Sequence, residues 1–265
     1  MKRNIGIVIG VVALVYVAAA LFLYSSQRDL MYFPTPAEEI SGFDRIEINS
    51  EDQTLDVWAA RRSDYGEAIV YFGGNAEPLL YTATLLNSLF PGKSIYLPYY
   101  RGYGGSAGQP SESAIYQDAL AVYDWVDERH SKVSVIGRSL GSGVATYLGS
   151  QRELKKLVLV TAYDSLEKVA GESFYMFPVS WLLKDKYDSF SRADAITEPT
   201  LMITADNDEV ITRAHSDRLH AALDPAKTEE VIVDGTTHND IATKREYAMA
   251  LLIFLDSEHV PVNVQ

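Results

Sequence analysis

The pattern of apolar and polar positions divides the chain into an apolar N-terminal stretch and a longer region of alternating short and long segments. Residues 5–24 carry no charged side chain, and as a helix they are long enough to cross a hydrocarbon core of about 30 Å. After a proline-stiffened link at residues 32–36, residues 44–48 and 55–60 alternate like the two strands of a hairpin. The pattern therefore predicts a membrane-spanning helix followed by a folded domain.

Short β-branched and aromatic runs then recur along the chain, separated by longer stretches with helical spacing. The short runs predict strands at residues 68–72, 94–97, 132–136, 157–160, 200–204 and 230–233. The longer stretches predict amphipathic helices at residues 78–90, 111–129, 140–151, 214–223 and 241–255. Alternation of this kind indicates an α/β fold, with a mostly parallel central sheet and helices on both of its faces.

Residues 162–191 interrupt this alternation, because they are about twice as long as a usual connection between a strand and a helix. The segment is rich in aromatic side chains, among them Phe174, Phe177 and Trp181. Two interpretations stay open for it. One is a pair of helices packed on the core, since aromatic clusters often serve packing; the other is a short helical lid that binds substrate.

The N-terminal apolar stretch fits either an uncleaved anchor or a secretory signal. Lys2 and Arg3 precede it, and the three alanines 18–20 resemble a signal-peptidase site. The apolar run, however, exceeds the roughly 7–15 residues of a signal's apolar region, so we expect a membrane anchor at residues 1–28 and a folded α/β domain at residues 29–265. The two basic residues favour a cytoplasmic N-terminus, which predicts that the domain lies on the extracytoplasmic side.

The composition excludes several classes of function. The net charge of −13 disfavours nucleic acid as a partner, because such proteins need clustered basic side chains. The absence of cysteine excludes disulfides, cysteine-ligated metals and thiol nucleophiles, and it leaves the redox compartment undetermined.

The chemistry that remains begins with a serine motif. Residues 137–141 read Gly-Arg-Ser-Leu-Gly, and residues 104–108 match the same G-x-S-x-G pattern around Ser106. Context separates the two matches: a predicted strand precedes and a predicted helix follows Ser139, whereas Ser106 lies in a glycine-rich loop. A serine on a sharp turn from strand to helix is the nucleophile of α/β-hydrolases, so Ser139 is the predicted nucleophile of an α/β-hydrolase fold.

A serine hydroxyl needs a base and an acid that orients the base, and in this fold they follow in the order Ser, Asp, His. His238 directly follows the last predicted strand, while the other histidines precede Ser139, lie in a predicted helix or stand in the C-terminal tail. Asp206 and Asp208 both lie in the loop after the strand at 200–204, and both qualify as the acid.

The reaction also needs two backbone N–H groups that bind the developing oxyanion. One comes from the residue after the nucleophile, which is Leu140. The other comes from the loop after an early strand, where Gly73 and Gly74 let the backbone approach a substrate closely and make the amide of Asn75 the expected donor.

With these residues in order, the sequence resembles the α/β-hydrolase-domain serine hydrolases that include protein depalmitoylases and lysophospholipid hydrolases, many with an N-terminal membrane anchor. The resemblance covers essentially the whole chain and rests on residues 30–34, 74–76, 100–108, 137–143, 163–166, 208–211 and 238–240. In this family the acid heads an Asp-Glu-Val-like run, which points to Asp208, and the loop of Ser106 is structural. Departures occur at Gly73, Tyr99, Ala162 and Ala205, where the family commonly has His, Asp, Pro and Gly.

Together these features predict a serine hydrolase that cleaves esters or thioesters through an acyl-enzyme, without a metal or organic cofactor. An aromatic insertion next to a membrane anchor favours an acyl-chain or lipid-like substrate, with Phe174, Phe177 and Trp181 as its binding residues. A peptidase or a hydrolase of small polar esters is the enzymatic alternative. A catalytically silent, membrane-tethered binding domain is the alternative from another class, because fold alone does not prove activity.

Overall fold

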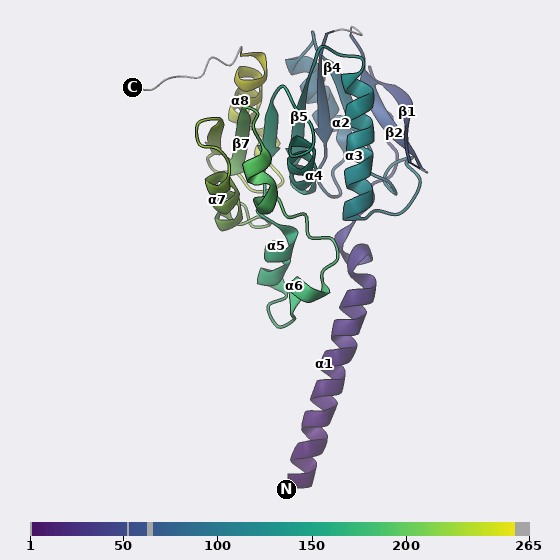
Figure 1. Cartoon of the computed structure of the whole chain (residues 1–265), viewed down its shortest axis with the longest axis vertical. Helices are drawn as coiled ribbons and strands as arrows, with labels where there is room; N and C mark the ends of the chain where they lie inside the picture. The colour runs from purple at the N-terminus through teal and green to yellow at the C-terminus, as the bar shows by residue number, and fades with distance from the viewer. Residues whose placement is uncertain (1, 52, 63–65, 258–265) are drawn as a thin grey trace.

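The computed structural model describes residues 2–51, 53–62 and 66–257, which form a long N-terminal helix and an α/β domain (Figure 1). Two sequence predictions concern residues outside these ranges. The end of the predicted domain, residues 258–265, and the side chains of residues 2 and 3, on which the predicted orientation depends, lie outside the described residues.

The domain is built on an eight-stranded sheet with the strand order β1-β2-β4-β3-β5-β6-β7-β8. Its strands are β1 Asp44–Ser50, β2 Gln53–Ala60, β3 Glu67–Phe72, β4 Ser94–Pro98, β5 Lys132–Arg138, β6 Leu157–Val160, β7 Thr200–Ala205 and β8 Thr228–Val233. β2 pairs antiparallel with β1 and β4, and all other pairs are parallel. The predicted hairpin and the predicted, mostly parallel sheet are thus confirmed. The inner strands are buried on both faces, as their continuous apolar runs indicate.

Helices cover both faces of the sheet (Figure 1). They are α2 Leu79–Leu89, α3 Glu112–Asp127, α4 Leu140–Gly149, α7 Arg213–Ala222 and α8 Arg245–Asp256. The last helix begins later than the sequence predicts, because a short 3₁₀ turn, η2 Ile241–Thr243, replaces its first turn. Asp240 holds this turn: its backbone carbonyl accepts hydrogen bonds from the backbone and the hydroxyl of Thr243.

The insertion, residues 162–191, joins β6 to β7 and carries two short helices, α5 Leu166–Ser173 and α6 Val179–Leu182. A third helical turn, η1 Phe190–Ala195, follows at its end. The α5 helix begins after Ser165, whose hydroxyl accepts a hydrogen bond from the amide of Lys168 and so caps the helix. The two helices project from the domain on the side where the N-terminal helix leaves it (Figure 1).

The N-terminal helix, α1 Lys2–Met31, leaves the domain as a single rod (Figure 1). Its apolar side chains from Ile5 to Phe22 are largely exposed. Among the described residues, the segment Asn4–Met31 is the one helix that is long and apolar enough to cross a membrane, a property that anchors and signal sequences share.

Candidate active site

Three loops from distant parts of the sequence meet at the carboxyl edge of the sheet. Ser139 follows β5, Asp208 lies in the loop after β7, and His238 lies in the loop after β8. The loop after β3, with Gly74 and Asn75, reaches the same edge, since a Cβ atom added to Gly74 would lie 3.5 Å from Cβ of Ser139. Parallel strands end at one edge of the sheet, which is why residues from four strands come together here.

Ser139 occupies a strained turn between β5 and α4. Its backbone has φ 49° and ψ −115°, a region that residues with a side chain rarely adopt. The turn fits only because its neighbours are glycines: a Cβ atom on Gly137 would lie 2.2 Å from the carbonyl oxygen of Gly141, and one on Gly141 would lie 2.1 Å from that of Phe72. The geometry is that of a nucleophile elbow, which exposes the serine hydroxyl above the sheet.

A chain of hydrogen bonds connects Ser139, His238 and Asp208. Nε2 of His238 lies 2.9 Å from Oγ of Ser139, and Nδ1 lies 2.8 and 3.0 Å from the two carboxylate oxygens of Asp208. The amides of Val210 and Ile211 donate to Oδ1 of Asp208 at 2.9 and 2.7 Å and fix the carboxylate. Only 2% of the Asp208 side chain and 8% of the His238 side chain are exposed, so water competes little for these bonds.

Asp206, the other carboxylate that the sequence offers, lies in the same loop but makes different contacts. Its side chain accepts hydrogen bonds from the Asn207 side chain at 3.1 Å and from the Gly235 amide at 3.4 Å, and the residue is exposed. Position along the chain could not separate the two aspartates, whereas the contacts of His238 do.

The loop after β3 is held beside Ser139 by side chains from the glycine-rich loop that follows β4. The hydroxyl of Tyr100 donates to the carbonyl oxygen of Gly73 at 2.7 Å, and the hydroxyl of Tyr103 donates to Oδ1 of Asn75 at 2.7 Å. Ser106, the serine of the second motif match, is buried; its hydroxyl accepts from the Asp56 amide and donates to the Tyr99 carbonyl. The loop after β4, which contains Ser106, therefore supports the loop after β3.

A buried ion pair that the sequence analysis missed lies between the loops around Ser139. Nη1 of Arg138 lies 3.2 Å from Oε1 of Glu77, with 12% and 7% of the two side chains exposed. Glu77 also accepts the Gly74 amide at 2.6 Å, and Arg138 donates to the carbonyl oxygens of His238 and Asn239 at 3.2 and 3.3 Å. The pair therefore joins the Gly74 loop to the His238 loop.

The surroundings of Arg138 favour its charged form. Burial lowers the pKa of the Arg138 guanidinium, but the charge and hydrogen bond of Glu77 together with the nearby Tyr71 and Tyr247 outweigh burial, and the pKa lies above its ordinary value. The hydroxyls of Tyr71 and Thr82 donate to Glu77 as well, so its carboxylate is fully hydrogen-bonded. The available signal in the sequence was position: Arg138 stands inside the serine motif and Glu77 two residues after Asn75.

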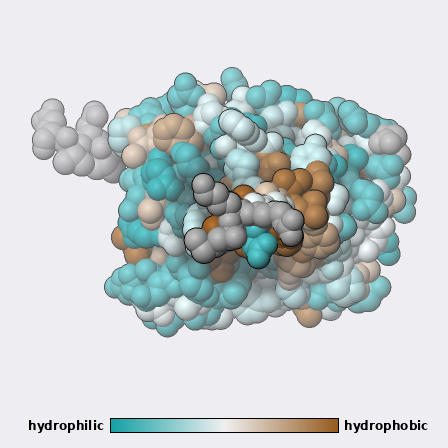
Figure 2. All heavy atoms as spheres, turned by 90° about the horizontal axis from the view of Figure 1, so that it is seen from below, coloured by the Kyte–Doolittle hydropathy of each residue, from teal (hydrophilic) through white to brown (hydrophobic). Residues whose placement is uncertain are grey.

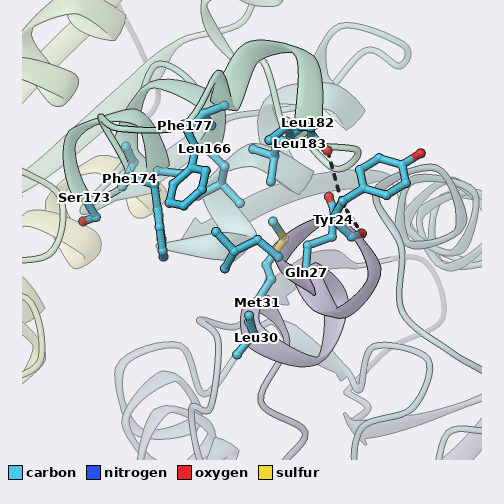
Figure 3. Close-up of a pocket in the computed structure, with 14 residues that line it drawn as sticks. Tyr24, Gln27, Leu30, Met31, Leu166, Ser173, Phe174, Phe177, Leu182 and Leu183 are labelled. Atoms are coloured by element: carbon cyan, nitrogen blue, oxygen red, sulfur yellow. Dashed lines mark hydrogen bonds between the residues drawn. The ribbon is translucent and has the colours of Figure 1, made fainter. Parts of the chain in front are cut away.

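The aromatic residues of the insertion divide into two groups. Phe174 and Phe177 line a cavity of about 250 Å³ between the insertion and the end of α1 (Figure 3). Trp181 does not line this cavity, and 87% of the residue is exposed. The sequence could not separate these side chains, because their direction depends on how the insertion packs against α1.

The described residues, 2–51, 53–62 and 66–257, contain no group of three or more His, Asp or Glu side chains arranged to hold a metal ion.

The fold and the nucleophile elbow define the class of α/β-hydrolases. Comparison with known families gives a match of residues 94–239 to the family described as serine hydrolase (FSH1), which is more than half of the chain. The protein belongs to this serine hydrolase family.

Two relatives align with most of the chain. The uncharacterized protein Rv2307c of Mycobacterium tuberculosis is 34% identical over 88% of both chains. Protein bem46 of Schizosaccharomyces pombe is 25% identical over 88% of this chain and 87% of its own. Among solved structures, the Pyrococcus furiosus esterase Pf2001 superposes with a TM-score of 0.69 at 18% identity, over 85% of this chain and 98% of that one. This likeness is one of fold.

Proposed function

We propose that the protein hydrolyses esters or thioesters with Ser139 as nucleophile, His238 as general base and Asp208 as the acid that orients the base. The observation that carries this proposal is the unbroken series of hydrogen-bond distances from the Asp208 carboxylate through both ring nitrogens of His238 to the Ser139 hydroxyl. Membership of the serine hydrolase family supports it independently.

The reaction follows from these positions. Ser139 attacks the substrate carbonyl carbon while Nε2 of His238 takes the hydroxyl proton. The bond to the leaving oxygen or sulfur then breaks, His238 returns the proton to the leaving group, and the acyl group stays on Ser139 as an ester. Water attacks this ester with the same proton transfers, which releases the carboxylic acid. Asp208 accepts the Nδ1–H bond and stabilises the imidazolium formed in both steps.

The backbone amides of Leu140 and Asn75 are the proposed oxyanion donors. Leu140 is the first residue of α4, where a backbone N–H has no acceptor within the helix. Asn75 follows Gly74, whose own amide donates to Glu77 and at which an added Cβ atom would lie 3.5 Å from Cβ of Ser139. Loss of one such donor typically lowers kcat by about 10²–10³.

An acyl-chain or lipid-like substrate is the class that we propose. On the face seen along α1, apolar side chains gather around this helix (Figure 2). The insertion adds Tyr175, Met176 and Trp181, which are 80%, 66% and 87% exposed. Large apolar side chains exposed together mark a surface that contacts a membrane or a partner, and a membrane concentrates substrates with acyl chains.

We further propose that residues 1–28 anchor the protein in a membrane and that the hydrolase domain, from residue 29, lies on the extracytoplasmic side. Retention of the helix is supported by its contacts with the insertion. The hydroxyl of Tyr16 donates to the carbonyl of Met176 at 2.8 Å, and its ring stacks on Phe177 with 5.1 Å between centroids. Cleavage after Ala20 would remove both contacts.

A series of p-nitrophenyl esters from acetate to dodecanoate tests the substrate class, with the full chain reconstituted in phosphatidylcholine vesicles. We expect kcat/KM to rise beyond acetate, and Ser139→Ala to hydrolyse none of the esters above background. A wild-type rate that is highest for acetate and falls with chain length would contradict the lipid-like substrate. Undiminished activity of Ser139→Ala would contradict the nucleophile.

A further inference from the structure

The cavity of about 250 Å³ has walls from opposite ends of the sequence. The last turns of α1 provide one wall, with Leu23, Leu30 and Met31, and the insertion provides the other, with Phe174 and Phe177. Figure 3 shows side chains from both segments directed into the space between them. A helix predicted to serve as an anchor thus also forms one wall of a cavity.

The two walls are fixed to each other by polar contacts. Nε of Arg28 lies 2.8 Å and Nη2 lies 3.1 Å from the two carboxylate oxygens of Asp185, which is a bidentate ion pair. The side chain of Gln27 donates to the Leu182 carbonyl at 3.1 Å and accepts from the Lys184 amide at 2.7 Å. The end of α1 is therefore a docked part of the domain and no loose tether.

The cavity suits an apolar occupant. Most lining side chains are hydrocarbon, and the amide of Gln27, the most polar group among them, is already engaged. Its two N–H groups go to the carbonyls of Tyr24 and Leu182, and its oxygen accepts from Lys184. A polar ligand would lose its hydration in this cavity and gain few hydrogen bonds in return, whereas a hydrocarbon chain would gain from leaving water.

Asn75 links the end of α1, which lines the cavity, to the loop beside Ser139. The side-chain nitrogen of Asn75 donates to the Met31 carbonyl at 2.6 Å, and its oxygen accepts from the Phe33 amide at 3.0 Å. The neighbouring Gly74 lies against Ser139. The end of α1 is thus bonded directly to the loop that lies beside the nucleophile.

We propose that this cavity binds the acyl chain of the substrate, so that α1 forms one wall of the substrate site and limits the chain length. This inference rests on the proposed function, because the acyl chain in the cavity belongs to the ester that Ser139 is proposed to cleave. The volume of the cavity is close to the lower end, about 300 Å³, of the range for ligand pockets, which favours acyl chains of medium length. The apolar, exposed part of α1 is continuous with the cavity wall, so the acyl chain of the substrate enters from the bilayer.

The test fills the cavity from each wall in turn. Leu23→Trp narrows it from α1, and Ala170→Trp narrows it from the insertion, since both residues line it. Leu21→Trp is the matched control, because Leu21 is a leucine on the same helix that does not line the cavity and is 63% exposed. Each full-length variant is reconstituted in phosphatidylcholine vesicles and assayed with p-nitrophenyl acetate and decanoate. Rates are divided by the concentration of sites that react with a fluorophosphonate, which removes any effect of misfolded protein.

We expect Leu23→Trp and Ala170→Trp to lower kcat/KM for decanoate by about 10- to 100-fold, the range for apolar groups excluded from a pocket. Acetate hydrolysis should stay within twofold of wild type, and Leu21→Trp should change neither rate. Decanoate rates that stay at wild type in both filled variants would overturn the inference, and so would equal losses for acetate and decanoate per reactive site. If the wild-type protein hydrolyses neither ester, the proposed function itself is wrong.

Discussion

The buried pair of Arg138 and Glu77 gives a prediction whose size follows from the structure. Glu77→Gln keeps the shape of the side chain but removes the charge that faces a guanidinium with 12% exposure. Leaving one partner of a buried pair without its counter-charge costs about 3–5 kcal/mol. At roughly 2–4 °C per kcal/mol for a domain of this size, the melting temperature should fall by about 6–20 °C.

Activity should fall for a separate reason. Glu77 accepts the Gly74 amide at 2.6 Å and so holds the loop of Asn75 beside Ser139. Glutamine has one carbonyl oxygen in place of two carboxylate oxygens, so it cannot keep all the hydrogen bonds that Glu77 accepts. We expect kcat for p-nitrophenyl acetate to fall by about 10- to 100-fold with KM little changed, which is less than the loss of a whole oxyanion donor.

The double variant Glu77→Gln/Arg138→Met separates the pair from a general effect of mutation. It removes both charges, so no unpaired charge stays buried, and it should melt at a higher temperature than Glu77→Gln alone. Melting is followed by intrinsic tryptophan fluorescence of the full chain in vesicles. If the losses of Glu77→Gln and of the single variant Arg138→Met add up to the loss of the double variant, the reasoning is refuted, as it is by a Glu77→Gln protein that melts within 2 °C of wild type.

Two further predictions concern the carboxylates. Asp208→Asn should lower kcat on the order of 10⁴-fold, because the asparagine amide donates to Nδ1 of His238 and forces the wrong tautomer. The control variant Asp206→Asn should keep kcat within twofold of wild type. Equal losses of kcat in the two variants would exclude Asp208 as the acid. Burial raises the pKa of Asp164, but hydrogen bonds from Arg218, His215, the Ser165 amide and Lys168 together outweigh burial and leave the pKa below its ordinary value. This stabilisation is complete above the unfolded pKa of about 3.9 and is lost as pH falls through the folded pKa. Arg218→Ala should therefore melt below wild type at neutral pH but lose less melting temperature than wild type as pH falls through about 4, and identical acid profiles would contradict this.

The sequence predicted the sheet well because its signals are local. Each buried strand is a short apolar run, and β5 and β7 match the predicted ranges within two residues at either end. The turn at Ser139 could also be predicted, because the strand before Ser139 and the glycines on either side of Ser139 are close to it in sequence. The order of elements that the fold imposes also predicted the loop in which His238 lies, next to Ser139.

The parts that sequence reasoning missed depend on distance in space. Glu77 lies in the loop after β3 and Arg138 ends β5, and neither residue type reveals that the two side chains form an ion pair. The same holds for the insertion, where Phe177 turns toward α1 and Trp181 turns to the outside. Aromatic content predicted a binding segment, but only the packing of α1 against it decides which ring lines the cavity.

Covalent labelling with a fluorophosphonate probe tests the central proposal most directly, because the probe reacts with a serine only when that serine is activated as a nucleophile. The full chain in vesicles is treated with the probe, digested, and the modified residue is identified by mass spectrometry. We predict modification of Ser139 in the wild type, loss of labelling in Ser139→Ala, and undiminished labelling in Ser106→Ala. Folded wild-type protein that takes up no probe would contradict the account and favour a catalytically silent, membrane-tethered binding domain.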